Sequence, residues 1–505
     1  MPSSVGPPPT GSGRCSLADE IDATHGGPGG HTAGGANGPR AGSVVEKGST
    51  VSRLVSLVKR VGWIVVIALV VVATAGGSLI AVLTARGLPT THGTLAIAGL
   101  DDAVRVTRDA NGIAWIEADS AHDLFLAQGY VHAQERMWQM EVWRHISSGR
   151  LSELFGSSTL TEDRFIRTLG WRQAAERDLA ALSPDARAVV DAYAAGVNDW
   201  IADHDGSLSL PFVVAGLKAG LGGGIGGYRL EPWGALDTLA WQKVQGWQLG
   251  GNFDTEVFRM LADAKLGDPG RTDELFPPYD ARMPVITPSG LEGSGGAGST
   301  AAGPLIVNAA RAGPMAARPP ALRSTTLGDA AAWRDVAAAS SSLLEIAGLD
   351  GADGIAGDHQ VGSNNWVIGP SKTTTKTALL ANDPHLGIGM PSVWYMNGLR
   401  CRAVSPDCPF DVAGVSFPGV PGVVLGHNAK IAWGATNADP DVEDLFTIEP
   451  DLTNPGNYLL AGQSIPFEIR HETIEVAGGP DVQLDVRTTR DGPILNDVDS
   501  RLKDA

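Results

Sequence analysis

The chain has 505 residues, which is enough for more than one domain and for a large buried core. Its formal net charge of -18 argues against nucleic acid as a partner. With 65 glycines, 32 prolines and only 19% charged residues, it is typical of a chain rich in loops and disordered parts. It has no zinc-type spacing of Cys and His, which excludes the common structural zinc modules.

The N-terminal part predicts a membrane anchor. Residues 1–60 are mostly Gly, Pro, Ser and Ala, a composition that predicts a disordered segment. Residues 61–84 then carry no charge and, as a helix, would rise roughly 36 Å, enough to cross a hydrocarbon core of about 30 Å. Lys59 and Arg60 precede this transmembrane helix and predict a cytoplasmic N-terminus, with the remainder of the chain outside the cell. The alternative is a cleaved secretory signal, whose apolar core would be only about 7–15 residues.

Two short strands and a long helix are predicted after the anchor. The strands cover residues 104–106 and 113–117, and Asp109–Gly112 between them form a hairpin turn. Ser120 is placed to cap a helix that continues to about Ser148. Apolar residues recur along this helix at helical spacing, so we expect them to be core.

The rest of the chain falls into three regions. Residues 90–350 are mainly helical in pattern, apart from the strands just described. Residues 351–362 are short, polar and rich in Gly, which predicts an exposed linker in which a cut would be tolerated. Residues 363–505 read as alternating strands and turns.

Two cysteines lie close together on either side of a Pro-containing loop. If Cys401 and Cys408 are extracytoplasmic, their spacing favours a loop disulfide over a metal pair.

A Ser and a His flank a predicted hairpin. The run from Gly362 to Gly369 reads GSNNWVIG, in which a Ser and two amides precede a short apolar strand. A turn follows, and Thr377–Ala381 predict the returning strand. Ser363 therefore sits at the start of the hairpin and His385 just past its far end. By pattern alone a turn Ser and a loop His are the commoner interpretation of these two residues.

The wider string resembles a known family. GSNNWVIG, followed by NDPHL at 382–386, closely resembles the self-cleavage site of the penicillin acylase family of N-terminal nucleophile (Ntn) hydrolases. Residues 128–156, 410–428 and 431–446 resemble the same family in the expected order. The resemblance implies an α+β fold, the four-layer αββα sandwich with two antiparallel sheets between helices. It also implies an amide hydrolase whose two chains derive from one precursor and stay associated.

A cut before Ser363 would create a self-contained catalyst. A Ser hydroxyl needs a base, and the sequence has no G-x-S-x-G elbow. If the Gly362–Ser363 bond is cut, Ser363 gains an α-amine with a pKa of about 7.7–8.0, a usable base at neutral pH. Gly362 suits such a cut because it has no Cβ to obstruct attack on its carbonyl.

The resemblance assigns the remaining roles. Ser363 would attack the carbonyl of a small-molecule amide and form an acyl-enzyme, which water hydrolyses. The backbone N–H of Asn437 would be one oxyanion donor, and His385 would help to orient the α-amine. The family's second oxyanion donor, an Asn side chain far into the second subunit, has no counterpart up to Ala505. A truncated, non-catalytic, membrane-anchored scaffold is therefore the alternative function.

Carboxylates after Asn437 suggest a hard cation. Asp441, Glu443 and Asp444 are close enough in sequence to share Ca²⁺ or Mg²⁺, although such a cluster alone is more often a solvated loop. The resemblance implies a structural Ca²⁺ site here. Asp441 and Asp444 would supply carboxylates, Glu443 its backbone carbonyl, and Glu256 a ligand from the first subunit. The ion would hold the two cleaved pieces together.

Overall fold

The computed structural model describes residues 49–218, 228–250, 252–275, 362–386, 389–437, 443–499 and 502. The predictions for residues 1–48, for 276–350 of the first helical region and for the linker up to 361 lie outside this part of the chain. The chain divides into two compact units, residues 1–73 and 74–505, and the division falls inside the first helix.

The α-helices of the described residues all lie before the first strand of the hairpin region. Their bounds are α1 (Ser49–Ala85), α2 (Ala121–Ser148), α3 (Ser152–Phe155), α4 (Leu160–Leu169), α5 (Trp171–Ala181), α6 (Pro184–Asp203), α7 (Leu210–Lys218), α8 (Ala235–Gly250), α9 (Phe253–Leu266) and α10 (Pro269–Asp273). Among the described residues, α1 alone is long and apolar enough to cross a membrane, and it begins earlier than the predicted span of 61–84.

The strands form four sheets within the described residues. Their bounds are β1 (Arg105–Arg108), β2 (Ala114–Ala118), β3 (Gly362–Ile368), β4 (Leu379–His385), β5 (Tyr395–Cys401), β6 (Asp411–Ser416), β7 (Leu425–Asn428), β8 (Ala432–Trp433), β9 (Glu449–Pro450), β10 (Asn457–Leu460), β11 (Gln463–Pro466), β12 (Glu468–Ile474) and β13 (Val482–Thr488). A six-stranded sheet has the order β1-β2-β5-β6-β7-β8, and three smaller sheets contain β9–β11, β12–β13 and β3–β4.

The six-stranded sheet departs from the antiparallel arrangement that the resemblance implied. Strands β2 and β5 pair in parallel, with Ala114 opposite Asn397, while the other pairs in this sheet are antiparallel. Parallel neighbours need a long crossover connection, and the helical part of the chain between β2 and β5 supplies one. The four-layer sandwich stays a prediction.

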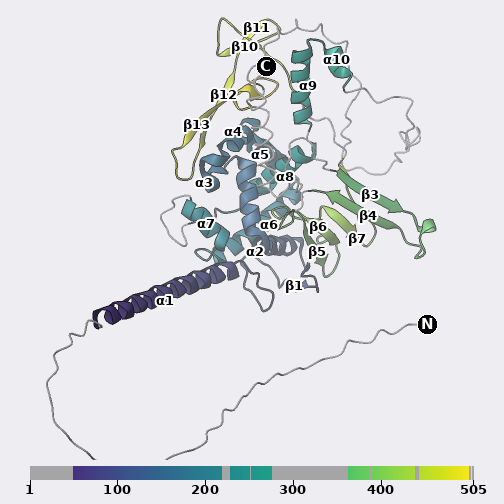
Figure 1. Cartoon of the computed structure of the whole chain (residues 1–505). Helices are drawn as coiled ribbons and strands as arrows, with labels where there is room; N and C mark the ends of the chain where they lie inside the picture. The colour runs from purple at the N-terminus through teal and green to yellow at the C-terminus, as the bar shows by residue number, and fades with distance from the viewer. Residues whose placement is uncertain are drawn as a thin grey trace, which may run out of the picture. The chain divides into compact units, whose positions relative to one another are not determined.

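Helix α2 is the centre of the folded part. The Ser120 hydroxyl accepts the Asp123 N–H at 3.0 Å and begins the helix as predicted, and Gly149, at φ 61°, ends it in the left-handed conformation. The helix packs against α6, α8, β2 and β5 (Figure 1). Two glycines allow its close contact with α6, because a Cβ on Gly129 or Gly196 would lie about 2 Å from a backbone oxygen of the facing helix.

Two further local predictions are confirmed. The Asp109 carboxylate accepts the backbone N–H groups of Asn111 and Ile113 at 2.8 and 3.0 Å, which closes the turn between β1 and β2. Cys401 and Cys408 form a disulfide that joins the end of β5 to the loop before β6.

Candidate active site

Strands β3 and β4 form an antiparallel hairpin that carries the predicted nucleophile (Figure 1). Gly362 lies opposite His385 and Ser363 lies opposite Pro384. The predicted hairpin is thus confirmed, with His385 as the last residue of β4 rather than just beyond it. The Gly362–Ser363 bond therefore lies at the N-terminal end of β3, within the first two pairs of the ladder.

Alternation along the strands assigns Ser363 to the partly covered face of the hairpin. Residues directly opposite each other in an antiparallel pair point to the same face, so Ser363 shares a face with Pro384 and Asn382. Positions 380, 382 and 384 of β4 are half-buried, whereas 379, 381, 383 and 385 are exposed. The hydroxyl of Ser363 is therefore expected on the inner face, and His385 on the outer one.

A cavity of about 780 Å³ borders strand β4. Leu380, Asn382, Asp383 and Pro384 of β4 line it, together with residues of α2, β7 and β8. The predicted site residues Ser363, His385 and Asn437 are not among its lining residues. The residues that α2 contributes lie at a local break in the helix, where Arg136 has φ -136° and ψ 16°. Arg136 also lines the cavity, and its guanidinium Nη1 donates to the Ser392 carbonyl at 2.7 Å.

His385 is held by two side chains of the outer face. Its Nε2 lies 2.9 Å from Asn364 Nδ2, and its Nδ1 lies 3.5 Å from an Asp383 carboxylate oxygen. If the Asn364 amide donates to Nε2, the ring proton is on Nδ1 and faces Asp383. The structure thus brings His385 together with Asn364 and Asp383.

Asn437 follows the short strand β8 and is half-buried. The segment leading to it is fixed to the hairpin, because the side-chain amide of Asn382 bonds to both backbone groups of Ala435. Asn437, the predicted oxyanion donor, thus lies two residues after Ala435, which bonds directly to β4, the strand that pairs with β3.

Three of the four predicted Ca²⁺ ligands line one cavity. Glu256 of α9, Glu443 and Asp444 border a cavity of about 520 Å³, and Asp441 lies outside the described residues. The Glu443 carbonyl, which the resemblance made a ligand, accepts the Asn252 side-chain N–H at 2.8 Å. A carbonyl oxygen has a second lone pair, so this bond is compatible with a metal contact. Glu256, Glu443 and Asp444 line the same cavity, but their carboxylate oxygens do not come close enough together to hold one cation.

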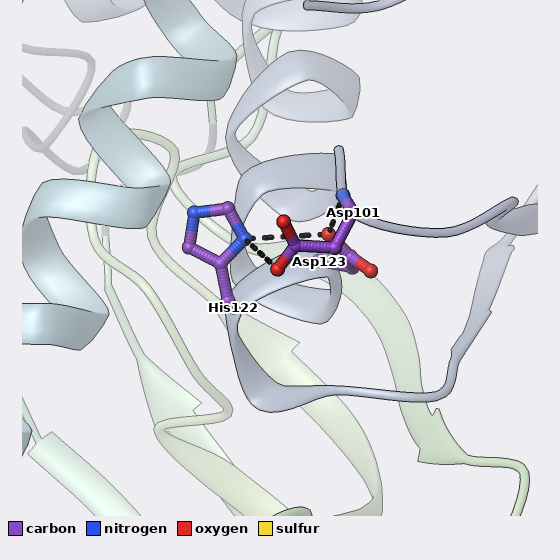
Figure 2. A group of neighbouring side chains, drawn as sticks. All are labelled: Asp101, His122 and Asp123. Atoms are coloured by element: carbon purple, nitrogen blue, oxygen red, sulfur yellow. Dashed lines mark hydrogen bonds and ion pairs between the residues drawn. The ribbon is translucent and has the colours of Figure 1, made fainter. Parts of the chain in front are cut away.

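The His and acidic side chains that do converge in the described residues are Asp101, His122 and Asp123 (Figure 2). The buried Asp123 carboxylate accepts the backbone N–H groups of Asp101 and Asp102 at 2.9 and 3.1 Å, and His122 Nδ1 lies 3.3 Å away. Burial would raise the pKa of Asp123, but these hydrogen bonds hold it below its ordinary value. The cluster therefore anchors the turn before β1 to the start of α2.

Sequence reasoning missed a buried polar network under the sheet. His132 of α2 bonds to the Tyr193 hydroxyl at 2.8 Å and to Ser416 Oγ at 3.2 Å. The Tyr193 hydroxyl in turn accepts the Gly419 N–H at 2.9 Å. Burial lowers the pKa of His132 to about 3, so the imidazole stays neutral. The sequence shows a His among the apolar residues of α2, which could have indicated a buried polar group. Its partners Tyr193 and Ser416 lie far away in the sequence, so the network itself could not be predicted.

Comparison with known proteins gives a consistent set of relatives. A family model described as Penicillin amidase matches residues 103–504. Acyl-homoserine lactone acylase QuiP of Pseudomonas aeruginosa is 33% identical over 416 residues, which are 82% of this chain and 42% of the relative. Penicillin acylase 2 proenzyme of Pseudomonas sp. (strain SE83) is 31% identical over 410 residues, 81% of this chain and 45% of the relative.

A solved structure, the thermostable penicillin G acylase from Alcaligenes faecalis, matches at 22% identity with a TM-score of 0.31. The match covers 37% of this chain and 97% of the solved chain. The chain spans less than half the length of the curated relatives named above.

Proposed function

The chain belongs to the penicillin amidase family, and from this we propose that it is a membrane-anchored amide hydrolase that cleaves itself at Gly362–Ser363. The observation that carries the proposal is the hairpin, in which Ser363 lies at the start of β3 opposite Pro384, a residue that lines a cavity. A cavity of about 780 Å³ is within the usual range for small-molecule sites. The substrate would be a small amide that joins an acyl group to an amine.

Self-cleavage would use the hydroxyl of Ser363. Its Oγ attacks the Gly362 carbonyl carbon, the C–N bond breaks, and the acyl group moves from nitrogen to oxygen as an ester. Water hydrolyses this ester, which leaves a carboxylate on Gly362 and frees both the hydroxyl and the α-amine of Ser363. The α-amine then takes the hydroxyl proton when Ser363 attacks an amide substrate, and the leaving amine receives a proton in return.

The neighbouring residues would support this chemistry. The Asn437 N–H would stabilise the oxyanion of the tetrahedral intermediate. His385, held by Asn364 and Asp383, would orient the new α-amine through the backbone at the end of β4. Water would hydrolyse the resulting acyl-enzyme and return Ser363 to its free form.

The anchor and the disulfide support an extracytoplasmic site. Helix α1 can span a membrane by length and composition, and disulfides persist in oxidising compartments. Labelling of Cys401 and Cys408 with a thiol reagent in intact cells, before and after reduction, tests this location. Labelling of both cysteines before reduction would show that they are not joined by a disulfide and would contradict this location.

Intact mass and N-terminal sequencing of the purified chain test the enzyme proposal, beside a Ser363→Ala control. We expect a new N-terminus that begins Ser-Asn-Asn-Trp in the wild type and no cut in the control. A single uncut chain in both samples would contradict self-cleavage at Gly362–Ser363.

We also propose a structural Ca²⁺ ion held by Glu256, Asp441, Glu443 and Asp444, which would join the two cleaved pieces. Carboxylate and carbonyl oxygens are the donors that Ca²⁺ prefers, and the shared cavity wall supports the assignment. We expect Ca²⁺ to raise the melting temperature and a chelator to lower it. Glu256→Gln should weaken the effect, whereas Glu274→Gln, an exposed residue after α10, should not. Equal melting temperatures with Ca²⁺ and chelator would contradict the site.

A further inference from the structure

Asn382 makes an unusual pair of hydrogen bonds to one peptide unit. Its Nδ2 donates to the Ala435 carbonyl at 2.9 Å, and its Oδ1 accepts the Ala435 N–H at 3.3 Å. A side-chain amide has one donor side and one acceptor side, so it can imitate the two bonds of a β-ladder pair. The same Nδ2 also lies 3.4 Å from the Asn364 carbonyl of β3. We call this arrangement the Asn382 clasp.

The residue before Ala435 is fitted to the clasp. A Cβ built on Gly434 would lie 2.7 Å from Cγ and 2.8 Å from Cβ of Asn382. These distances are shorter than real carbon contacts, so any larger residue at 434 would push Asn382 away. Gly434 therefore permits the close approach on which the two hydrogen bonds depend.

The clasp connects two sheets that share no ladder in the described residues. Strand β8 is the last strand of the six-stranded sheet, where Trp433 pairs with Gly426 of β7. The Trp433 indole N–H also donates to the Val424 carbonyl at 2.9 Å. The hairpin is a separate two-stranded sheet. Asn382 thus fixes the end of one sheet against the strand that pairs with Ser363.

We propose that Asn382 is a positioning residue that sets the distance between the Ser363 hydroxyl and the Asn437 backbone. This inference rests on the proposed function, in which these two groups act on one carbonyl. Asn382 lies on the Ser363 face of the hairpin, and Ala435 is two residues before Asn437. Loss of the clasp releases this segment, and a misplacement of about 1 Å can cost roughly 100-fold in rate.

The test compares self-cleavage of five variants of the full chain by intact mass. Asn382→Leu removes both bonds at similar size, and Asn382→Asp keeps the acceptor but replaces the donor. The control is Asn365→Ala, because Asn365 is the exposed register partner of Asn382. Gly434→Ala introduces the overlapping Cβ. The double variant Gly434→Ala with Asn382→Ala, which lacks the amide but keeps the Cβ of residue 382, tests whether the two positions act through the same contact.

A second readout measures the clasp without any catalysis. Hydrogen exchange of the 431–437 peptide is followed in the uncut Ser363→Ala background, with and without Asn382→Leu. Loss of a hydrogen bond to Ala435 N–H is expected to speed its exchange about tenfold.

The expected result is slower cleavage in both Asn382 variants, by about 10- to 100-fold, with the Asn365→Ala rate unchanged. Gly434→Ala should slow cleavage as well, and the double variant should cleave about as slowly as the Asn382 variants, because the clasp is absent in all of them. For any amide substrate that is turned over, kcat should fall more than KM rises.

Two results overturn the positioning role. One is faster exchange at Ala435 with an unchanged cleavage rate, and the other is unchanged exchange. A wild-type chain that stays uncut contradicts the proposed function and the positioning role with it. The exchange data separate that failure from a failure of the clasp, since they do not depend on cleavage.

Discussion

The helical part around α2 and the hairpin β3–β4 differ in how much of their surface this chain covers. In the helical part, Trp143 and Trp241 stack with ring centroids 4.1 Å apart, and each is 1% exposed. In the hairpin, Trp366 is 68% and Val367 72% exposed. The contrast indicates that stability resides in the helices, while the proposed chemistry resides on a strand pair with few contacts of its own.

The largest effect should come from a matched pair of Trp substitutions. Trp241→Ala removes a buried ring from the stack and is expected to cost about 3–5 kcal/mol in the free energy of unfolding. Trp366→Ala, at an exposed position, should change it by less than about 0.5 kcal/mol. Denaturant unfolding followed by circular dichroism measures both. Similar losses for the two variants would mean that the hairpin is as well packed as the helices.

A pair of Gly substitutions tests the helix contact itself. Gly196→Ala places a Cβ 1.8 Å from the Leu126 carbonyl oxygen of α2, so α2 and α6 must separate, at a cost of about 1–3 kcal/mol or more. Gly246→Ala on α8 meets nothing within 4 Å and should instead stabilise by about 0.5–1 kcal/mol. Thermal melting distinguishes the two signs. A neutral Gly196→Ala variant would show that the interface is looser than described.

The smallest expected effect is a dependence of helical stability on acid. Burial would raise the pKa of Glu153, but hydrogen bonds from His145 and Arg150 lower it to about 2. Because the folded pKa is lowered, this stabilisation is present above about pH 4.5 and is lost as the pH falls toward 2.

Glu153→Gln should therefore flatten the decline in unfolding free energy between pH 4.5 and 2, by about 1–2 kcal/mol after allowance for solvent screening. Asp185→Asn, at an exposed position in the first turn of α6, serves as the control. If the unfolding free energies of the wild type and Glu153→Gln depended on pH in the same way, Glu153 would not be the source of the acid sensitivity.

Local chemistry explains which features could be predicted from the sequence. The Ser120 cap, the Asp109 turn, the β3–β4 hairpin and the disulfide all depend on residues near one another in the chain. The family itself was recognisable from the GSNNWVIG string, and the match over residues 103–504 confirms it.

Features that join distant segments were not predictable in this way. The parallel pairing of β2 with β5 and the bond from His132 to Ser416 connect positions more than 200 residues apart. The Asn382 clasp spans a shorter separation but involves a backbone partner, Ala435, whose side chain carries no signal. Single-sequence patterns report periodicity and turns, and they do not report which backbone group a polar side chain will find.

The open hairpin also has a consequence for handling the protein at high concentration. Within the described residues the β-ladder of β3 and β4 includes no third strand, so neither outer edge is covered by a strand in this part of the chain. Trp366, Val367 and Ile368 lie exposed along that edge, as in segments that favour intermolecular β-pairing. We expect concentrated samples to associate through this strand, and Val367→Lys to suppress the aggregation.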